Sequence, residues 1–78
     1  MVDLKQLLAD LARAIVDNPN EVAVTETEIN GVVELHLHVA PDDMGKVIGR
    51  HGKIARSIRL VMKSAANIAG KRVSVEID

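Results

Sequence analysis

The dipeptide Asn30-Gly31 is the feature that most constrains how this chain can fold. Both residues tolerate the positive φ angles of a type I′ turn, and the segments on either side alternate between apolar and polar side chains. A two-residue loop also fixes the register of the strands that it joins, because a slip by one residue would turn every side chain to the other face. The predicted pairs are Ile29 with Val32, Thr25 with His36, and Val24 with Leu37.

The alternation predicts a sheet with one buried face and one face in water. The buried face should carry Val22, Val24, Val33, Leu35, Leu37 and Val39. The exposed face should carry Ala23, Thr25, Thr27, Glu34, His36 and His38. His36 and His38 lie on one face, but Glu34 is the only further ligand near them. We therefore expect surface histidines and no metal site.

Helical periodicity precedes the hairpin and predicts a helix from Leu4 to Val16. Its apolar stripe consists of Leu4, Leu7, Leu8, Leu11 and Ile15. Asp3 is the predicted N-cap, and Gln6 three residues later completes the pattern of a capping box. Pro19 cannot continue a helix and disfavours helical geometry at the residue before it, so this helix should end ahead of the proline.

The second half of the chain predicts two helices and a third strand. Pro41-Asp42-Asp43 should begin a short helix, where the two carboxylates suit the dipole at its N-terminus. A longer helix is expected from Lys53 to Ala69, with Gly70 as its C-cap. Lys71 to Asp78 alternates again, and its inward residues should be Val73, Val75 and Ile77. The expected fold is one α+β domain, residues 1–78, of order α-β-β-α-α-β, with helices packed on one face of a three-stranded sheet.

Two residue classes are absent, and each absence excludes a kind of function. The chain has no Phe, Trp or Tyr, which excludes nucleic-acid modules that stack bases on aromatic side chains. It has no Cys, which excludes disulfides, thiolate metal sites and cysteine nucleophiles. No apolar run approaches the roughly 20 residues of a membrane span. The N-terminus lacks the pattern of a signal peptide, so we expect a cytoplasmic protein with no membrane contact.

Charge is distributed unevenly along the chain, although its formal net value is only −1. Residues 1–43 contain nine acids and two bases, a net charge of −7. Residues 44–75 contain no acid and have a net charge of +8. The bases in residues 44–75 are Lys46, Arg50, Lys53, Arg56, Arg59, Lys63, Lys71 and Arg72. Such a stretch is typical of a surface that binds a polyanion, and the alternative is an ordinary solvated helix face.

The segment Gly49-Arg50-His51-Gly52 lies between the two predicted helices of this basic stretch. Two glycines three residues apart allow a tight turn and a close approach of a ligand to the backbone. The following helix would direct free N–H groups at that ligand, an arrangement that favours phosphate. A P-loop would need a glycine where Val47 stands, and the glycine triple of a dinucleotide site is absent.

The stretch from Val47 to Gly52 resembles the (V/I)-I-G-x-x-G signature of the KH domain, a module that binds single-stranded nucleic acid. The order of elements resembles the type II KH topology, and the whole chain is similar to the KhpA family of small bacterial RNA-binding proteins. The resemblance implies that the loop at 49–52 grips the RNA backbone. It implies an aliphatic groove formed by Ile48, Ile54 and Ile58. The basic candidates for RNA contact are Lys46, Lys53, Arg56 and Arg59.

One position departs from the family pattern. Many KH domains have a large aliphatic residue three positions after the second glycine, whereas this chain has Ala55 there and Ile54 before it. The resemblance also implies a homodimer and a heteromer with a KhpB/Jag-type KH protein. Val61 is a candidate for the dimer contact, because the apolar arc of the long helix is wider than one packing surface needs. Leu60 sits apart, within the polar arc, and is another candidate.

Three functional hypotheses follow. The first is a non-catalytic RNA chaperone or post-transcriptional regulator without a cofactor, which affects cell shape and cell-wall biogenesis through its partner. The second is a protein-interaction module in which dimerisation is the main task and RNA contact is secondary. The third is an enzyme, and it has the least support, because the three serines form no recognisable Ser/His/Asp arrangement.

Overall fold

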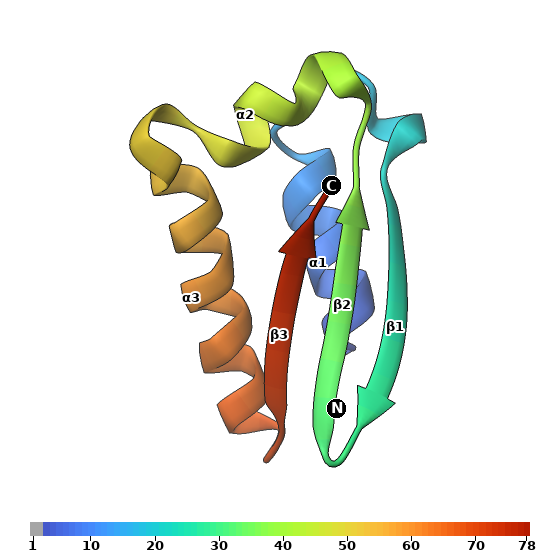
Figure 1. The fold of residues 1–78 in the computed structure, drawn as a ribbon, viewed down its shortest axis with the longest axis vertical. Coiled ribbons are helices and arrows are strands. Elements are labelled where there is room, and N and C mark those ends of the chain that lie inside the picture. The colour runs from blue at the N-terminus through green and yellow to red at the C-terminus, as the bar shows by residue number, and fades with distance from the viewer. Residues whose placement is uncertain (1–2) are drawn as a thin grey trace.

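The computed structural model describes residues 3–78 and confirms the predicted order of elements (Figure 1). The helices are α1 (Leu4–Arg13), α2 (Met44–Ile48) and α3 (Lys53–Ile68). The strands are β1 (Ala23–Ile29), β2 (Val32–His38) and β3 (Arg72–Ile77). Single 3-10 turns lie at Pro19–Glu21, Pro41–Asp43 and Arg50–Gly52. The predicted domain and the reading of the N-terminus also include residues 1 and 2, which lie outside the described residues.

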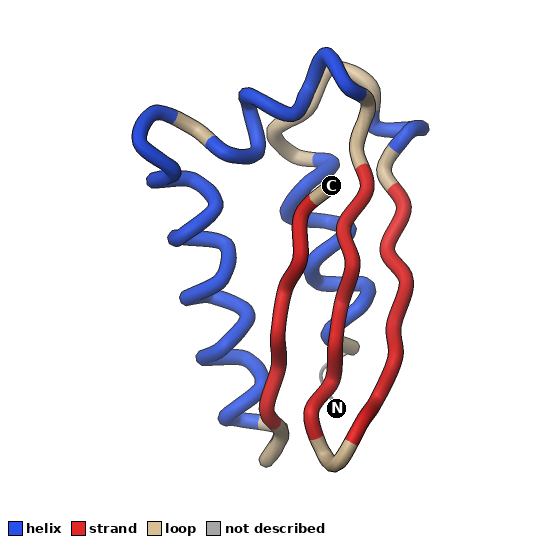
Figure 2. Tube along the Cα trace, in the orientation of Figure 1, coloured by secondary structure: helices blue, strands red, loops and turns tan. Residues whose placement is uncertain are grey.

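Strand β2 is the centre of a mixed sheet of order β1-β2-β3 (Figure 2). It pairs antiparallel with β1 and parallel with β3. The predicted hairpin register is confirmed, with Ile29 opposite Val32 at the turn. The φ angles of Asn30 and Gly31 are +52° and +80°, as a type I′ turn requires. The turn therefore fixes which side chains of the hairpin face inward.

The core lies between one face of this sheet and the helices (Figure 1). All six residues predicted for the buried face are buried, while Thr25, Thr27, His36 and His38 on the other face are exposed. The largest fully buried apolar side chains are Leu8, Leu35, Leu37, Met62, Val39 and Val47. Burial of one such side chain contributes roughly 1.5–3 kcal/mol, so an aliphatic core can replace the missing aromatic one.

Helix α1 ends at Arg13, three residues before the predicted end at Val16. The backbone N–H groups of Asp17 and Asn18 donate to the carboxylate of Asp43, at 3.2 and 3.0 Å. These bonds connect the segment after α1 to the turn at Pro41–Asp43. The short helix is likewise later than predicted, because residues 41–43 form a 3-10 turn and α2 begins only at Met44.

The predicted cap of α1 is half confirmed. The Asp3 carboxylate accepts a hydrogen bond from the Gln6 backbone N–H at 3.1 Å. The capping box is wrong in its second half, because the Gln6 side chain donates instead to Asp10 at 2.8 Å. A carboxylate one turn further along competes successfully for that amide. Among residues 3–78, no helix has both the length and the apolar character needed to cross a membrane.

Candidate nucleic-acid interface

The loop between α2 and α3 has positive φ angles at both of its glycines, Gly49 and Gly52. Gly49 has φ +75° and ψ 173°, a region that side chains essentially never adopt. A Cβ atom at Gly49 would lie 2.6 Å from the side chain of Ile54. Gly52 has φ +72°, but a Cβ atom there would meet nothing within 4 Å. The first glycine is therefore required by both packing and conformation, and the second by conformation alone.

The two residues between these glycines have side chains that are exposed to solvent. Arg50 and His51 are both exposed. His51 has a left-handed backbone, with φ 56° and ψ 24°, which costs a residue other than glycine roughly 1–2 kcal/mol. Such strain is concentrated at functional sites in proteins, where the surrounding structure maintains it. The loop thus presents a guanidinium and an imidazole on a backbone that is held in place.

Helix α3 begins immediately after the loop, at Lys53. Its N-cap is Gly52, which has no side chain to accept hydrogen bonds from the first turn. The N–H of Gly52 itself is used within the loop, where it donates to the Gly49 carbonyl at 3.1 Å. The N–H of Lys53 donates in the same way to the Arg50 carbonyl. The lack of a side-chain cap and the neighbouring cations make this end of α3 favourable for an anion.

One flank of α3 is basic and faces strand β3. The Arg59 Nε–H donates to the backbone carbonyl of Val75 at 3.3 Å, which fixes this flank beside the edge strand. Lys63 lines the same surface next to Val73. Arg56 is exposed and falls on the same arc, at about 100° per residue. Arg56 and Arg59, both predicted to contact RNA, therefore share the β3 side of the helix.

The other flank of α3 is apolar and faces α1. An open hollow of about 220 Å³ is lined by Leu11, Ile15, Ile54, Ser57, Ile58 and Val61. The predicted groove residues Ile54 and Ile58 therefore lie on the α1 side, across the helix from Arg59. Ile58 is only 6% exposed, so most of this side chain belongs to the core. Ile48, at the end of α2, is half-buried.

The two dimer candidates occupy different surroundings. Val61 lines the apolar hollow and is 45% exposed. Leu60 is 65% exposed and is not among the residues that line the hollow. The two side chains therefore offer separate surfaces, although they are neighbours in sequence.

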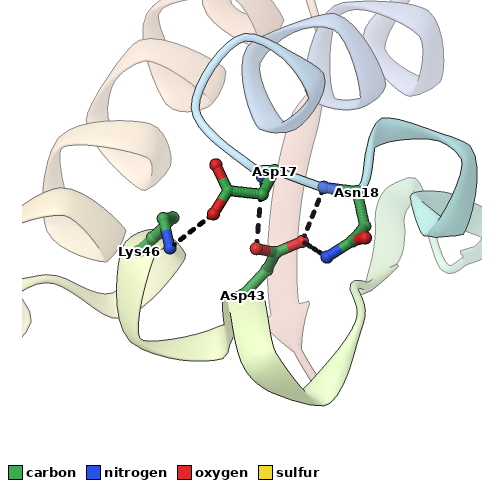
Figure 3. A network of polar contacts seen from close by, with 4 residues as sticks. All are labelled: Asp17, Asn18, Asp43 and Lys46. Atoms are coloured by element: carbon green, nitrogen blue, oxygen red, sulfur yellow. Dashed lines mark hydrogen bonds and ion pairs between the residues drawn. The ribbon is translucent and has the colours of Figure 1, made fainter.

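Figure 3 shows a polar network that holds α2, and thus the loop, against the chain that follows α1. Asp43 is fully buried. Its carboxylate accepts hydrogen bonds from the backbone of Asp17 and Asn18 and from the Asn18 side chain, the last at 3.1 Å. Lys46 pairs with Asp17 at 3.0 Å. Sequence reasoning assigned Asp43 to the helix dipole and missed this role, because its partners are 25 residues or more away.

The network also changes the pKa values of two of its members, Asp43 and Lys46. Burial by itself raises the pKa of Asp43, but the hydrogen bonds from Asn18 and the Asp17 backbone, with the charge of Lys46, outweigh it and lower the pKa overall. The hydrogen bond and charge of Asp17 raise the pKa of Lys46. Lys46, a predicted RNA contact, is therefore charged and already has a carboxylate partner.

Most other cations of the acid-free stretch have no such partner. Lys71 lies 3.9 Å from Glu28. Six bases of the stretch form no ion pair within the described part of the chain: Arg50, Lys53, Arg56, Arg59, Lys63 and Arg72. In the same part of the chain no group of three acids and histidines is placed to hold a metal ion. The positive charge is therefore available to a ligand.

Solved structures with the same fold include a variant of Era of Aquifex aeolicus bound to GDP and AlF4−. The match has a TM-score of 0.61 at 20% sequence identity and covers 99% of this chain but 31% of Era. A second Era structure, in complex with a segment of 16S ribosomal RNA, matches with the same TM-score and covers 97% of this chain and 30% of that one. At this identity the likeness concerns the fold alone.

Comparison of sequences identifies the family of this chain, which the likeness of folds does not. The protein named RNA-binding protein KhpA in Clostridium acetobutylicum is 53% identical over 74 residues, which cover 95% of this chain and 99% of the relative. KhpA of Treponema pallidum is 45% identical over 73 residues, 94% of this chain and 91% of the relative. These are names of a binding protein and not of an enzyme, in agreement with the predicted lack of catalysis. The family model described as KhpA/KhpB, KH domain, matches residues 5–77, and this chain therefore belongs to that family.

Proposed function

We propose that this chain is a non-catalytic RNA-binding protein of the bacterial cytoplasm that holds short single-stranded RNA at the loop 49–52. The observation that carries the proposal is the geometry of this loop. Two positive-φ glycines present Arg50 and His51 at the start of α3, which has no side-chain cap, beside cations that form no ion pair within residues 3–78. The names of the relatives, which describe RNA-binding proteins, support it.

In this proposal, different groups of the protein contact the phosphate backbone of the RNA and its bases. The loop and the first turn of α3 offer backbone N–H groups, Arg50 and Lys53 to a phosphate. About four nucleotides are held by the loop of a KH domain. Because the chain has no aromatic residue, the bases are held by aliphatic contact and hydrogen bonds. Lys46 joins the site only if a phosphate replaces Asp17 as its partner.

The test replaces Arg50→Asp and His51→Asp together. We expect RNA affinity in a mobility-shift assay to fall at least roughly 10- to 100-fold, since the loss of a single charge-assisted hydrogen bond costs about 1.5–3 kcal/mol. Lys5→Asp with Arg13→Gln, on α1, is the control with the same change in formal charge. A folded loop variant that binds RNA as tightly as the wild type would refute the site.

The proposed cellular role is that of an RNA chaperone or post-transcriptional regulator, with effects on cell shape and cell-wall biogenesis. We place a KhpB/Jag-type KH protein as its partner in that role. The support is membership of a family whose description joins KhpA and KhpB.

We also propose that the chain forms a homodimer through the apolar flank of α3. Ile54, Val61 and Ile68 recur every seven residues along it and are 39%, 45% and 82% exposed. Heptad spacing places such residues on one seam, which a second helix can cover. Joining two weak RNA sites in one particle raises their combined affinity. If association were the main task of the protein, this surface would matter more than the loop.

A further inference from the structure

We propose that Asp17 competes with RNA for Lys46 and thereby lowers the affinity of the site at the loop 49–52. The Asp17 carboxylate holds the Lys46 ammonium in the free protein, and a phosphate of the RNA must displace it. The inference rests on the proposed function, because it concerns one cation of the same site.

Lys46 lies close to the loop that is proposed to hold RNA. It is one helical turn before Gly49, about 4.5 Å along the axis at 1.5 Å per residue. The Gly49 N–H still donates to the Gly45 carbonyl at 2.9 Å, so α2 runs directly into the loop. The ammonium of a lysine is at the end of a flexible four-carbon stem and can turn from one anion to another. Lys46 can therefore contact a phosphate at the loop once its ammonium is released.

Lys46 differs from most cations of the acid-free stretch because it has a close carboxylate partner. Its ammonium lies 3.0 Å from Asp17 Oδ2, whereas six other bases of the stretch form no ion pair within residues 3–78. The hydrogen bond and charge of Asp17 raise the pKa of Lys46, and the charges of Asp43 and Asp42 add to this increase. Asp17 is the one of these three carboxylates that forms an ion pair with Lys46 among the described residues.

The backbone of Asp17 is fixed by the buried carboxylate of Asp43 (Figure 3). The N–H groups of Asp17 and Asn18 donate to this carboxylate at 3.2 and 3.0 Å. These bonds hold Asp17 beside Lys46 whether or not its own side chain is charged. The tertiary structure therefore keeps a carboxylate next to a cation that lies 29 positions further along the chain.

The ion pair itself is exposed. The side chain of Asp17 is 75% exposed and that of Lys46 is 45% exposed. Exposed ion pairs are weak, because water and dissolved salt screen the two charges. A phosphate can therefore take the place of the Asp17 carboxylate, but part of the free energy of RNA binding is used to break the pair.

This exchange of partners has a signature in the salt dependence of RNA affinity. A cation that is free before binding adds to the salt dependence, because the phosphate that it neutralises releases counterions. When Lys46 moves to a phosphate, the Asp17 carboxylate is left unpaired and attracts a cation from solution. The two effects oppose each other, so Lys46 should add little to the salt dependence in the wild type. Without the Asp17 charge it should add about 0.7, the value for one phosphate contact of a single strand.

The experiment compares Asp17→Asn with Asp42→Asn. Asp17→Asn keeps the backbone N–H that donates to Asp43 and loses the charge that pairs with Lys46. Asp42→Asn makes the same change of charge at an exposed residue that also acts on Lys46 but forms no ion pair with it among residues 3–78. Fluorescence anisotropy measures the binding of an oligouridylate of about ten nucleotides, longer than the roughly four that a KH loop holds, over a range of salt concentrations.

We expect Asp17→Asn to bind this RNA roughly threefold more tightly than the wild type at low salt, a small gain because an exposed ion pair is weak. The slope of log affinity against log salt concentration should steepen by about 0.7. Asp42→Asn should gain less affinity and keep the slope of the wild type, because it frees no cation.

Lys46→Gln completes a double-mutant cycle, which tests whether the gain acts through this lysine. Asp17→Asn should give no gain in a chain that also carries Lys46→Gln. Lys46→Gln should lower the affinity more in the Asp17→Asn chain than in the wild type, because only the former has a free ammonium to lose.

Three results would overturn the inference. Asp17→Asn could bind RNA no more tightly than the wild type, it could gain no more than Asp42→Asn, which reports net charge only, or its gain could persist beside Lys46→Gln. Asp17→Ala, which also keeps the backbone N–H, replaces Asp17→Asn if thermal unfolding shows that variant to be destabilised. A wild type that does not bind RNA would refute the proposed function itself, whereas each of the three results leaves that function intact.

Discussion

At the scale of single residues, the loop depends on two glycines for different reasons. Gly49→Ala adds a Cβ atom 2.6 Å from Ile54, in a backbone region reserved for glycine. Gly52→Ala meets no neighbour, so its cost is the left-handed conformation alone, about 1–2 kcal/mol. We expect Gly49→Ala to lower the free energy of unfolding by more than Gly52→Ala does. Urea unfolding of both variants measures the difference.

Gly52→Ala is thus the internal control for Gly49→Ala, since both replace a positive-φ glycine of one loop. Equal losses of stability would contradict the packing argument and leave conformation as the only constraint. The strained backbone of His51 is another effect of a single residue in this loop. His51 has a left-handed backbone and an exposed side chain, so it adds to the cost of the loop without adding to the core.

At the scale of elements, the position of α2 depends on Asp43. Asp43→Asn removes the charge that three donors share, and Asp42→Asn makes the same change at an exposed neighbour. We expect Asp43→Asn to lower the thermal unfolding midpoint at neutral pH by several degrees. Asp42→Asn should leave it unchanged. Equal midpoints for the two variants would show that the buried network does not stabilise the fold.

The pH dependence of this effect has a definite sign. Because the pKa of Asp43 is lower in the folded protein than in the unfolded chain, its contribution to stability is complete above the unfolded value, about 4. The contribution is lost as the pH falls through the folded pKa. The difference in unfolding midpoint between wild type and Asp43→Asn should therefore be constant near neutrality and shrink below about pH 4. A difference that grows on acidification would contradict the lowered pKa.

At the scale of the whole molecule, α3 has a basic flank that faces β3 and an apolar flank that faces α1, and the proposed dimer uses the apolar flank. Val61→Asp places a charge in the apolar hollow, and Leu60→Asp makes the same change outside it. We expect Val61→Asp to convert a dimeric wild type to monomers in analytical ultracentrifugation. Leu60→Asp should stay dimeric. A monomeric wild type, or equal disruption by both variants, would contradict the proposed dimer surface.

The sequence predicted the sheet well, because its signals are local. Asn30-Gly31 sets its own turn, and strict alternation assigns each hairpin residue to a face without reference to the rest of the chain. The signals failed at the end of α1, where a carboxylate from another element competes for the backbone of Asp17 and Asn18. The periodicity of apolar residues in a sequence does not show that a carboxylate from a distant element will accept hydrogen bonds from this backbone.

The same limit applies to the candidate site. By itself the sequence determined the glycine loop, the uncapped helix after it and the acid-free stretch, since each depends on residues adjacent in the chain. Only the tertiary structure decided that the basic flank of α3 faces the edge strand β3 while Ile54 and Val61 face α1. Periodicity assigns residues to the faces of a helix, but packing between distant elements decides what each face meets.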